Sequence, residues 1–489
     1  MPKAPKLLNP KVQPMLDLII KNGILLSMAG GKAGIIPHGA IGIRDDQIIC
    51  VDESLTLEKL YTAKRVIDAE GKFILPGFVN AHTHSSLGIG KGILTGLRYY
   101  LEQGLAGYIE PGNIETTMAG ARMHILEGLK QGFTTFCDNN SNMDKIAAIY
   151  EEFGARARIS EMVREMPWDY RGKLEEIYSF DRKYAEPQLK ATYRLLDRYG
   201  TDPADRISVM VSFQGLDYNS EELVLEIKEL AARHKTMIHT HLAQSPFEVR
   251  QCEMRYGKRP VAVMDQLGLL NQNTLAAHMV YNTSEENKLA ARNGLRMCYC
   301  PNSFTLAGGI PPAAEYLHFG GTVGIGSDEC TYNCVNPFVE MRSALIRGNI
   351  GARLASVPPI KLFSIFRMAT IESAKVIGMD QHIGSLEPGK KADVVIFDQH
   401  NVNMVPILVS PMSNVIQNMI IAATGSEVET VVIGGRIIME KRKMLAIDEP
   451  AVIGDAQKFG QLAAEAAYEY YKNLPDSEVL KLQQDYYPD

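Results

Sequence analysis

Apolar and polar positions alternate along the chain in short blocks that predict strands and helices in turn. Eight apolar runs bounded by turn residues predict strands at residues 74–80, 133–138, 155–162, 207–213, 236–241, 273–279, 295–300 and 321–327. Between several of these strands, apolar residues recur at helical spacing, over residues 116–131, 143–154, 187–199, 220–234 and 284–293. Eight strands separated by helices are typical of a (β/α)8 barrel of the TIM type, in the α/β class.

The two ends of the chain have a different pattern. Short apolar runs joined by turn residues predict strands at 17–28 and 39–51 near one end, and at 392–398 and 428–439 near the other. The chain therefore begins and ends in β structure. After Gly454 a polar segment rich in alanine and tyrosine predicts a helical tail, which we interpret as an arm for packing or for oligomerisation.

Composition narrows the choice of partners and location. With 489 residues, the chain is too long for one ordinary core, so we expect one large domain and a smaller one. The net charge is −6 and no block of lysine and arginine occurs, which argues against nucleic acid and anionic membranes as partners. No apolar stretch reaches the roughly 18 residues of a membrane span, and the first residues lack the apolar core of a secretory signal. An odd number of cysteines, seven, favours reduced thiols and a cytoplasmic location.

His82 and His84 form the most informative pair of residues. The apolar run at 73–81 predicts one buried strand that leads directly into them. Side chains two residues apart on a strand point to the same face, so both imidazoles can bind one metal ion. In a surface loop such a pair would mean little, but at the end of a buried strand it indicates a metal site.

Other predicted strands end in further metal-binding side chains. In a barrel of this type, functional groups lie at the carboxyl ends of the strands. His278 ends the sixth predicted strand and Asp328 ends the eighth. His239 and His241 share one face of the fifth strand, so spacing does not choose between them, although His241 is nearer the strand end.

Three imidazoles and one carboxylate, with room for a water molecule, suit one divalent transition metal. Zn²⁺ is favoured and Fe²⁺ is the alternative, whereas Mg²⁺ and Ca²⁺ prefer oxygen ligands. An open water position indicates catalysis, because the pKa of a zinc-bound water falls to about 7. Cys298 and Cys300, and Cys330 and Cys334, have spacings that a second metal could use. We interpret these cysteines as small buried apolar residues.

With these residues identified, the chain resembles the amidohydrolase superfamily. It is most similar to the branch that holds nucleobase, S-adenosylhomocysteine and guanine deaminases and the triazine hydrolases. The resemblance covers nearly all of residues 17–445. It rests on the stretches at residues 75–84, 239–244, 300–303, 326–328, 369–370 and 383–393.

The resemblance implies a domain organisation. A metal-dependent (β/α)8 barrel would span residues 75–384, and a small β-sandwich would combine residues 1–74 with 385–450 from both chain ends. Residues 451–489 would remain as the helical tail. Members of this branch are often dimers or larger, so a homo-oligomer is expected by analogy.

The resemblance also implies roles for the candidate residues. His82, His84, His241 and Asp328 would hold a single metal ion, and His278 would orient the attacking water. No lysine occurs in residues 207–215, which disfavours the two-metal arrangement of other superfamily members. Glu127 matches a glutamate that is common in this branch, and a structural ion pair is the favoured interpretation of it.

One position departs from the pattern of the deaminases. They carry a glutamate three residues after the fifth-strand histidine, where it moves a proton from the water to the ring nitrogen. Here the residue is Gln244, whose amide cannot exchange a proton near neutral pH. Three interpretations stay open. Asp328 and His278 do all the proton transfer; the substrate needs no ring protonation or is protonated by another acid, such as Glu329 or Glu248; or the sequence is a deliberately disabled variant.

Two further departures concern the substrate. Adenosine-type deaminases carry a Pro-His pair after the fourth strand, where this chain has residues 212–218 without histidine. A Trp-Leu pair usually closes the site after the first strand, and Tyr100 stands at the tryptophan position here. Both changes argue against a nucleoside substrate.

These observations predict a metal-dependent hydrolase that attacks a C=N carbon of a small nitrogen heterocycle and releases ammonia or an amine. Asp328 would act as the general base and His278 would stabilise the developing charge. Gln244, Tyr100 and Asn302 would hold the ring. The alternative within the enzyme class is displacement of chloride or an alkylamine from a triazine-like ring, or cleavage of an amide or amidine.

A non-catalytic binding or assembly protein of the same fold is a further alternative. The absence of glutamate at Gln244 motivates it. The complete ligand set argues against it, because a protein that has lost its chemistry usually loses metal ligands first.

Overall fold

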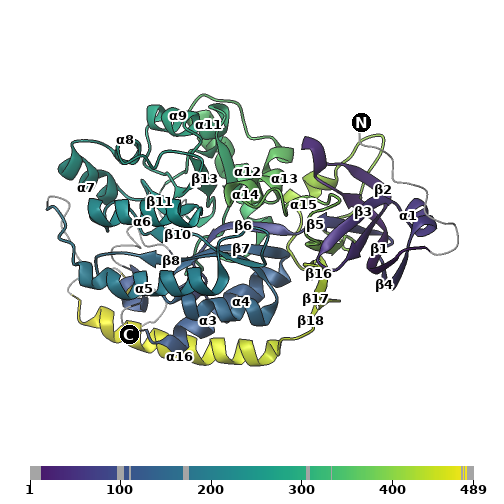
Figure 1. Cartoon of the computed structure of the whole chain (residues 1–489), viewed down its shortest axis with the longest axis horizontal. Coiled ribbons are helices and arrows are strands. Elements are labelled where there is room, and N and C mark those ends of the chain that lie inside the picture. Colours follow the sequence, from purple (N-terminus) through teal and green to yellow (C-terminus); the bar gives the residue numbers. More distant parts are fainter. Residues whose placement is uncertain are drawn as a thin grey trace.

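The computed structural model describes residues 13–95, 104–109, 112–168, 176–303, 309–331, 333–474, 477 and 479–481. Figure 1 shows a large body of strands and helices with a small β domain at one end, where the purple N-terminal strands lie. The yellow C-terminal helix runs along one side of the large body (Figure 1).

The large body is a barrel of parallel strands. Its strands are β6 (Phe78–Thr83), β7 (Phe133–Asn140), β8 (Arg156–Val163), β9 (Ile207–Val209), β10 (Val211–Phe213), β11 (Ile238–Leu242), β12 (Thr274–His278), β13 (Arg296–Tyr299) and β14 (Thr322–Ile325). Neighbours pair in the order β6-β7-β8-β10-β11-β12-β13-β14, and β9 pairs with β8. A parallel bridge between Thr83 and Asp328 joins the first strand to the last. The predicted barrel is confirmed.

Helices cover the outside of this barrel. They are α2 (Ala106–Ile109), α3 (Ile114–Lys130), α4 (Met143–Phe153), α5 (Arg182–Tyr199), α6 (Glu221–His234), α7 (Pro246–Tyr256), α8 (Pro260–Gln266), α9 (Ser284–Arg292), α11 (Ala313–His318), α12 (Pro337–Leu354), α13 (Leu362–Met368) and α14 (Ile371–Val376). The five predicted helices are present, with shifted ends. The largest shift is in α5, which begins before Pro187 because the Asp181 side chain caps it by accepting from Lys183 N at 3.0 Å.

The apolar run at 73–81 is two strands rather than the single strand predicted. β5 (Lys72–Pro76) belongs to the small domain, and β6 begins the barrel after Gly77. A Cβ atom on Gly77 would lie 2.0 Å from Thr134 Oγ1, so only glycine fits where the chain passes between the two sheets.

The small domain combines strands from both chain ends. They are β1 (Met15–Leu26), β2 (Ile35–Arg44), β3 (Gln47–Glu53), β4 (Thr62–Asp68), β5, β15 (Val394–Asp398), β16 (Val428–Ile433), β17 (Arg436–Glu440) and β18 (Lys443–Met444), with α1 (Ser54–Leu60) beside them. Ile20 and Ile41 from the first half pack in one apolar cluster with Val394 and Val432 from the second. The sheet thus encloses a core between its two halves, as expected for a small sandwich.

A buried ion pair connects the two domains. Arg156 at the start of β8 donates to Asp393 through Nε at 2.7 Å and through Nη2 at 3.0 Å. Both side chains are almost completely buried. Asp393 also accepts from the backbone N–H of Gly434 at 2.8 Å, which ties the pair to the turn between β16 and β17.

Two helices follow the barrel in the sequence. α15 (Val415–Ile421) packs against α12 and α13. α16 (Glu449–Lys472) lies against α3 and α2, and an ion pair of 2.5 Å joins Glu449 to Lys130. None of the helices in the described ranges has the length and apolar character that crossing a bilayer requires.

Candidate metal centre

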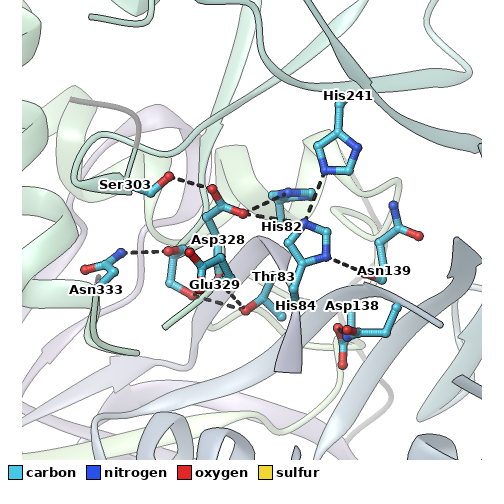
Figure 2. A network of polar contacts seen from close by, with 12 residues as sticks. His82, Thr83, His84, Asp138, Asn139, His241, Ser303, Asp328, Glu329 and Asn333 are labelled. Carbon is cyan, nitrogen blue, oxygen red and sulfur yellow. Dashed lines mark hydrogen bonds and ion pairs between the residues drawn. The ribbon is translucent and has the colours of Figure 1, made fainter. Parts of the chain in front are cut away.

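The predicted metal-binding side chains converge at the carboxyl ends of the barrel strands. His82 lies in β6 and His84 follows it, His241 lies in β11, His278 ends β12, and Asp328 follows β14. Donor atoms of His82, His84 and Asp328 lie within 4.8 Å of one another, and so do those of His82, His241 and His278. Figure 2 shows Asp328 facing His82 and His84, and His241 in contact with His84.

Local backbone conformation helps to aim two of these side chains. Asp328 has a φ of 58° and His278 has a φ of 78°, in the left-handed region that non-glycine residues rarely adopt. Such conformations cost free energy and persist where the surrounding structure fixes them, commonly at functional sites. The bridge between Asp328 and Thr83 provides such a constraint for one of the two.

The hydrogen bonds of His84 and His241 fix their tautomers. His84 Nδ1 lies 2.5 Å from the carbonyl oxygen of Asn139, and His241 Nδ1 lies 2.6 Å from that of Gln214. A carbonyl oxygen only accepts, so each Nδ1 carries a hydrogen, and in the neutral imidazole the opposite Nε2 then presents a lone pair. The two Nε2 atoms are 3.2 Å apart. Two facing lone pairs repel each other unless a cation or a proton lies between them, so this geometry favours a bound cation.

His82 is hydrogen-bonded to a second histidine, His239. Its Nδ1 lies 2.8 Å from His239 Nε2. Its Nε2 is buried and has no hydrogen-bond partner among the residues that the structure describes. His239 therefore supports His82, while His241 on the same strand faces the centre. A metal ion would satisfy the remaining nitrogen, because ligating histidines usually bind a protein group through their other nitrogen.

The electrostatics of the cluster suit a cation. Burial lowers the pKa of His82, His241 and His278 well below 6.5, so these imidazoles are neutral at neutral pH. Burial alone would raise the pKa of Asp328, but His278, His84 and the hydroxyl of Ser303 together hold it below its ordinary value. One carboxylate among neutral imidazoles is a donor set that fits a divalent transition metal.

These side chains line part of a cavity, which we call its floor. The floor comprises four of the five cluster residues (His84, His241, His278 and Asp328) together with Gln214, Gln244 and Glu329. Gln214 Oε1 and Gln244 Nε2 are both buried and lack a hydrogen-bond partner within the described ranges. Two such amides at the floor of a cavity can bind a polar ring through its donor and acceptor atoms.

Gln214 was not predicted as a site residue. It follows β10, at the position of the fourth predicted strand's carboxyl end. That position was the available signal, since the other site residues occupy equivalent places on their strands.

Asn302 and Tyr100 were also predicted to contact the substrate. Asn302 does not line the described cavity, and its side chain instead accepts from Arg347 and Ser343 and donates to Asn333. The structure therefore gives no support to a contact between Asn302 and the substrate. Tyr100 lies outside the described residues.

Three glutamates were considered from the sequence, and the structure places them in different surroundings. Glu127 pairs with Lys91 at 2.5 Å, which agrees with the structural interpretation. Glu248 is fully buried and does not line the cavity, and burial and the nearby Asp217 raise its pKa well above the ordinary value. Glu329 lines the cavity, next in sequence to Asp328.

Within the described ranges, the cysteines considered for a second metal site are not grouped with other metal-binding side chains. Cys298 and Cys300 are fully buried among apolar side chains of the barrel interior. Cys330 lies 3.2 Å from His124 Nδ1. Among the residues with described positions, no cysteine belongs to a group spaced to hold a metal ion.

A comparison with models of known protein families identifies the family of this chain. The model of the amidohydrolase family matches residues 73–438, which include the whole histidine and aspartate cluster. The chain belongs to the amidohydrolase family. It is therefore a hydrolase that acts on C–N bonds, as its resemblance to this superfamily predicted.

Relatives and solved structures agree with this membership. A 5'-deoxyadenosine deaminase of Methanococcoides burtonii is 30% identical over 91% of this chain and 97% of its own length. A 5-methylthioadenosine/S-adenosylhomocysteine deaminase of Pelotomaculum thermopropionicum is also 30% identical, over 91% and 98%.

Two solved structures share the fold of this amidohydrolase. An adenosine deaminase from Xanthomonas campestris with bound zinc has a TM-score of 0.83 at 24% identity, covering 93% of this chain and 100% of that one. An atrazine chlorohydrolase from Arthrobacter aurescens TC1 complexed with zinc has a TM-score of 0.79 at 20% identity, covering 91% and 100%.

Proposed function

We propose that this amidohydrolase removes an amino group hydrolytically from a nitrogen heterocycle, with one divalent metal ion. The observation that carries the proposal is the pair of Nε2 atoms of His84 and His241, which lie 3.2 Å apart beside Asp328 while each Nδ1 is bonded to a backbone carbonyl. The names of the two 30%-identical relatives, both deaminases of adenosine derivatives, support the reaction type.

His82, His84, His241 and Asp328 would hold the metal, with Zn²⁺ as the first choice and Fe²⁺ as the alternative. A metal bound there supplies a water of lowered pKa and a positive charge beside the oxygen that becomes negative. The zinc in two structures of the same fold supports a divalent metal in general.

The chain's own groups would move the protons. Asp328 is ionised and its Oδ2 accepts from Ser303 Oγ at 2.5 Å, which fixes the orientation of the carboxylate. It would take a proton from the attacking water and pass it to the leaving amine. His278 is neutral and lines the cavity beside it, so it would orient the same water by a hydrogen bond.

The buried amides would hold the ring. Gln244 Nε2 would donate to a ring nitrogen and Gln214 Oε1 would accept from an N–H of the substrate, because both atoms lack other partners in the described chain. Neither amide can protonate the ring. Glu329 also lines the cavity, but its two oxygens accept from Thr331 N and Oγ1, so we assign the proton of that step to Asp328, after it has taken this proton from the water.

A screen for ammonia release tests the proposal. The zinc-loaded protein is offered aminopterins, aminopurines including adenosine derivatives, aminopyrimidines and aminotriazines. We expect ammonia from at least one class, loss of the activity in Asp328→Asn, and nearly full activity in Cys298→Ala. Absence of ammonia from every class would overturn the proposal. The screen also tests whether a nucleoside is excluded, as residues 212–218 predict, or accepted, as the names of the relatives suggest.

Displacement of another leaving group is the second candidate. The observation that favours it is the amide of Gln244 at the cavity floor, since a leaving group such as chloride does not require a proton. Chloride release from chlorotriazines, without ammonia release from any amino heterocycle, would select this candidate.

A further inference from the structure

The C-terminal helix α16 forms part of the wall of the active-site cavity. Ala463, in the middle of this 24-residue helix, is one of the residues that line it, together with His84 and Asp328. Ala463 is only 6% exposed. A segment that begins more than 120 residues beyond the last barrel strand in sequence therefore contributes to the site. Figure 1 shows this helix running along the barrel.

Helix α16 contributes to the apolar part of the cavity lining, which we call the wall. The wall includes Ile89, Leu105, Tyr108, Ile109, Trp168 and Ala463. The polar part of the lining includes Asn113, Thr116 and Thr117 besides the imidazoles, amides and carboxylates of the floor. Leu105, Tyr108, Ile109 and Trp168 belong to an apolar cluster that also contains Ala467 and Tyr471 of α16. This cluster is separate from the main core of the barrel.

Contacts at both ends hold α16 in this position. The hydroxyl of Tyr471 donates to the carbonyl oxygen of Gly104, and a Cβ on Gly107 would lie 2.3 Å from the Tyr471 ring. At the other end, Glu449 pairs with Lys130 at 2.5 Å and accepts from Met444 N at 2.9 Å. The helix is thus fixed to the segment that carries Leu105, Tyr108 and Ile109, and the wall is a built part of the site.

We propose that α16 sets substrate specificity: Ala463 leaves room for an apolar substituent on the heterocycle, distal to the carbon that loses the amine. The inference rests on the proposed function, because it concerns the same cavity. Its physical basis is the short side chain of alanine in a wall of large apolar residues. Burial of an apolar substituent there stabilises the complex by roughly 25 cal/mol per Å² of apolar surface.

A pair of substrates tests the inference. The reactive ring of the ammonia screen is used with and without a benzyl group at the position farthest from the amino group. We expect Ala463→Leu to lower kcat/KM for the benzyl compound, relative to kcat/KM for the unsubstituted ring, about tenfold or more, mainly through KM. Ala463→Val adds a smaller side chain, so we expect it to lower kcat/KM for the benzyl compound selectively but to a smaller extent. This variant keeps the test valid if the leucine variant folds poorly.

Ala451→Leu is the matched control, because Ala451 is an exposed alanine of the same helix. It should change neither substrate. An equal loss for both substrates in Ala463→Leu, or no loss for either, would overturn the inference and leave the proposed function intact. If no ring releases ammonia, the proposed function fails first and the inference fails with it.

Discussion

At the carboxyl ends of the barrel strands, His82, His84 and Asp328 crowd around one point with other polar groups. Towards the amino ends of the same strands, the barrel interior is filled by apolar side chains such as Val79 and Leu275. This contrast indicates that the carboxyl ends and the amino ends of the same strands have different functions. Crowded imidazoles without a ligand repel each other, so the carboxyl end is arranged for binding and chemistry at the expense of stability. The amino end supplies the packing that tolerates this arrangement.

The first prediction removes the general base at the carboxyl end. Asp328→Asn keeps the shape of the side chain but removes its charge, so it cannot accept a proton. We expect kcat/KM for ammonia release to fall by about a thousandfold or more. The midpoint of urea unfolding for the metal-free protein should change little. Steady-state kinetics of Asp328→Asn beside Cys298→Ala checks this, and full activity in the asparagine variant would remove the assignment.

The second prediction concerns the amino ends of the barrel strands, where Arg156 begins β8. Arg156→Met leaves Asp393 buried without its cation, and breaking a buried pair in this way costs about 3–5 kcal/mol. Urea unfolding should show that loss, while kcat/KM stays within about threefold of the parent because Arg156 does not line the cavity. If Arg156→Met kept normal stability but lost activity, the amino ends of the strands would serve catalysis rather than stability, which would contradict our assignment.

The third prediction concerns the amides at the cavity floor. Gln244→Glu keeps the size of the side chain but replaces the N–H donor by an acceptor. If the amide donates to the ring, kcat/KM should fall about tenfold, the value of one hydrogen bond. A large increase in rate would instead indicate that the position needs a carboxyl group, as in the deaminases of the superfamily.

The fourth prediction uses the pH dependence of stability. Burial raises the pKa of Glu161, at the end of β8, to about 8, although it accepts from Asn142 N and Met143 N. Between about pH 4.5 and 8 the unfolded chain loses this proton and the folded protein keeps it, so the free energy of unfolding falls as pH rises. Glu161→Gln should flatten that fall in urea titrations at several pH values. An unchanged slope would contradict a protonated Glu161.

The sequence was sufficient for the barrel and for locating the side chains that gather at its carboxyl end. Strand periodicity located β6 to β14, and His82, His278 and Asp328 could be found because each occurs at or just beyond a strand end. Local patterns could not show that the run at 73–81 divides at Gly77, because the division depends on contact with Thr134. They also could not place Ala463 at the active site, since only long-range packing brings α16 there.

The central claim is that one metal ion lies between the imidazoles and Asp328. Metal analysis of the purified protein, before and after chelation, tests it most directly when ammonia release is followed on the same samples. We predict about one zinc or iron per chain, loss of metal and activity together on chelation, and recovery of both on adding Zn²⁺. Undiminished ammonia release from protein with less than about a tenth of an ion per chain would contradict the claim.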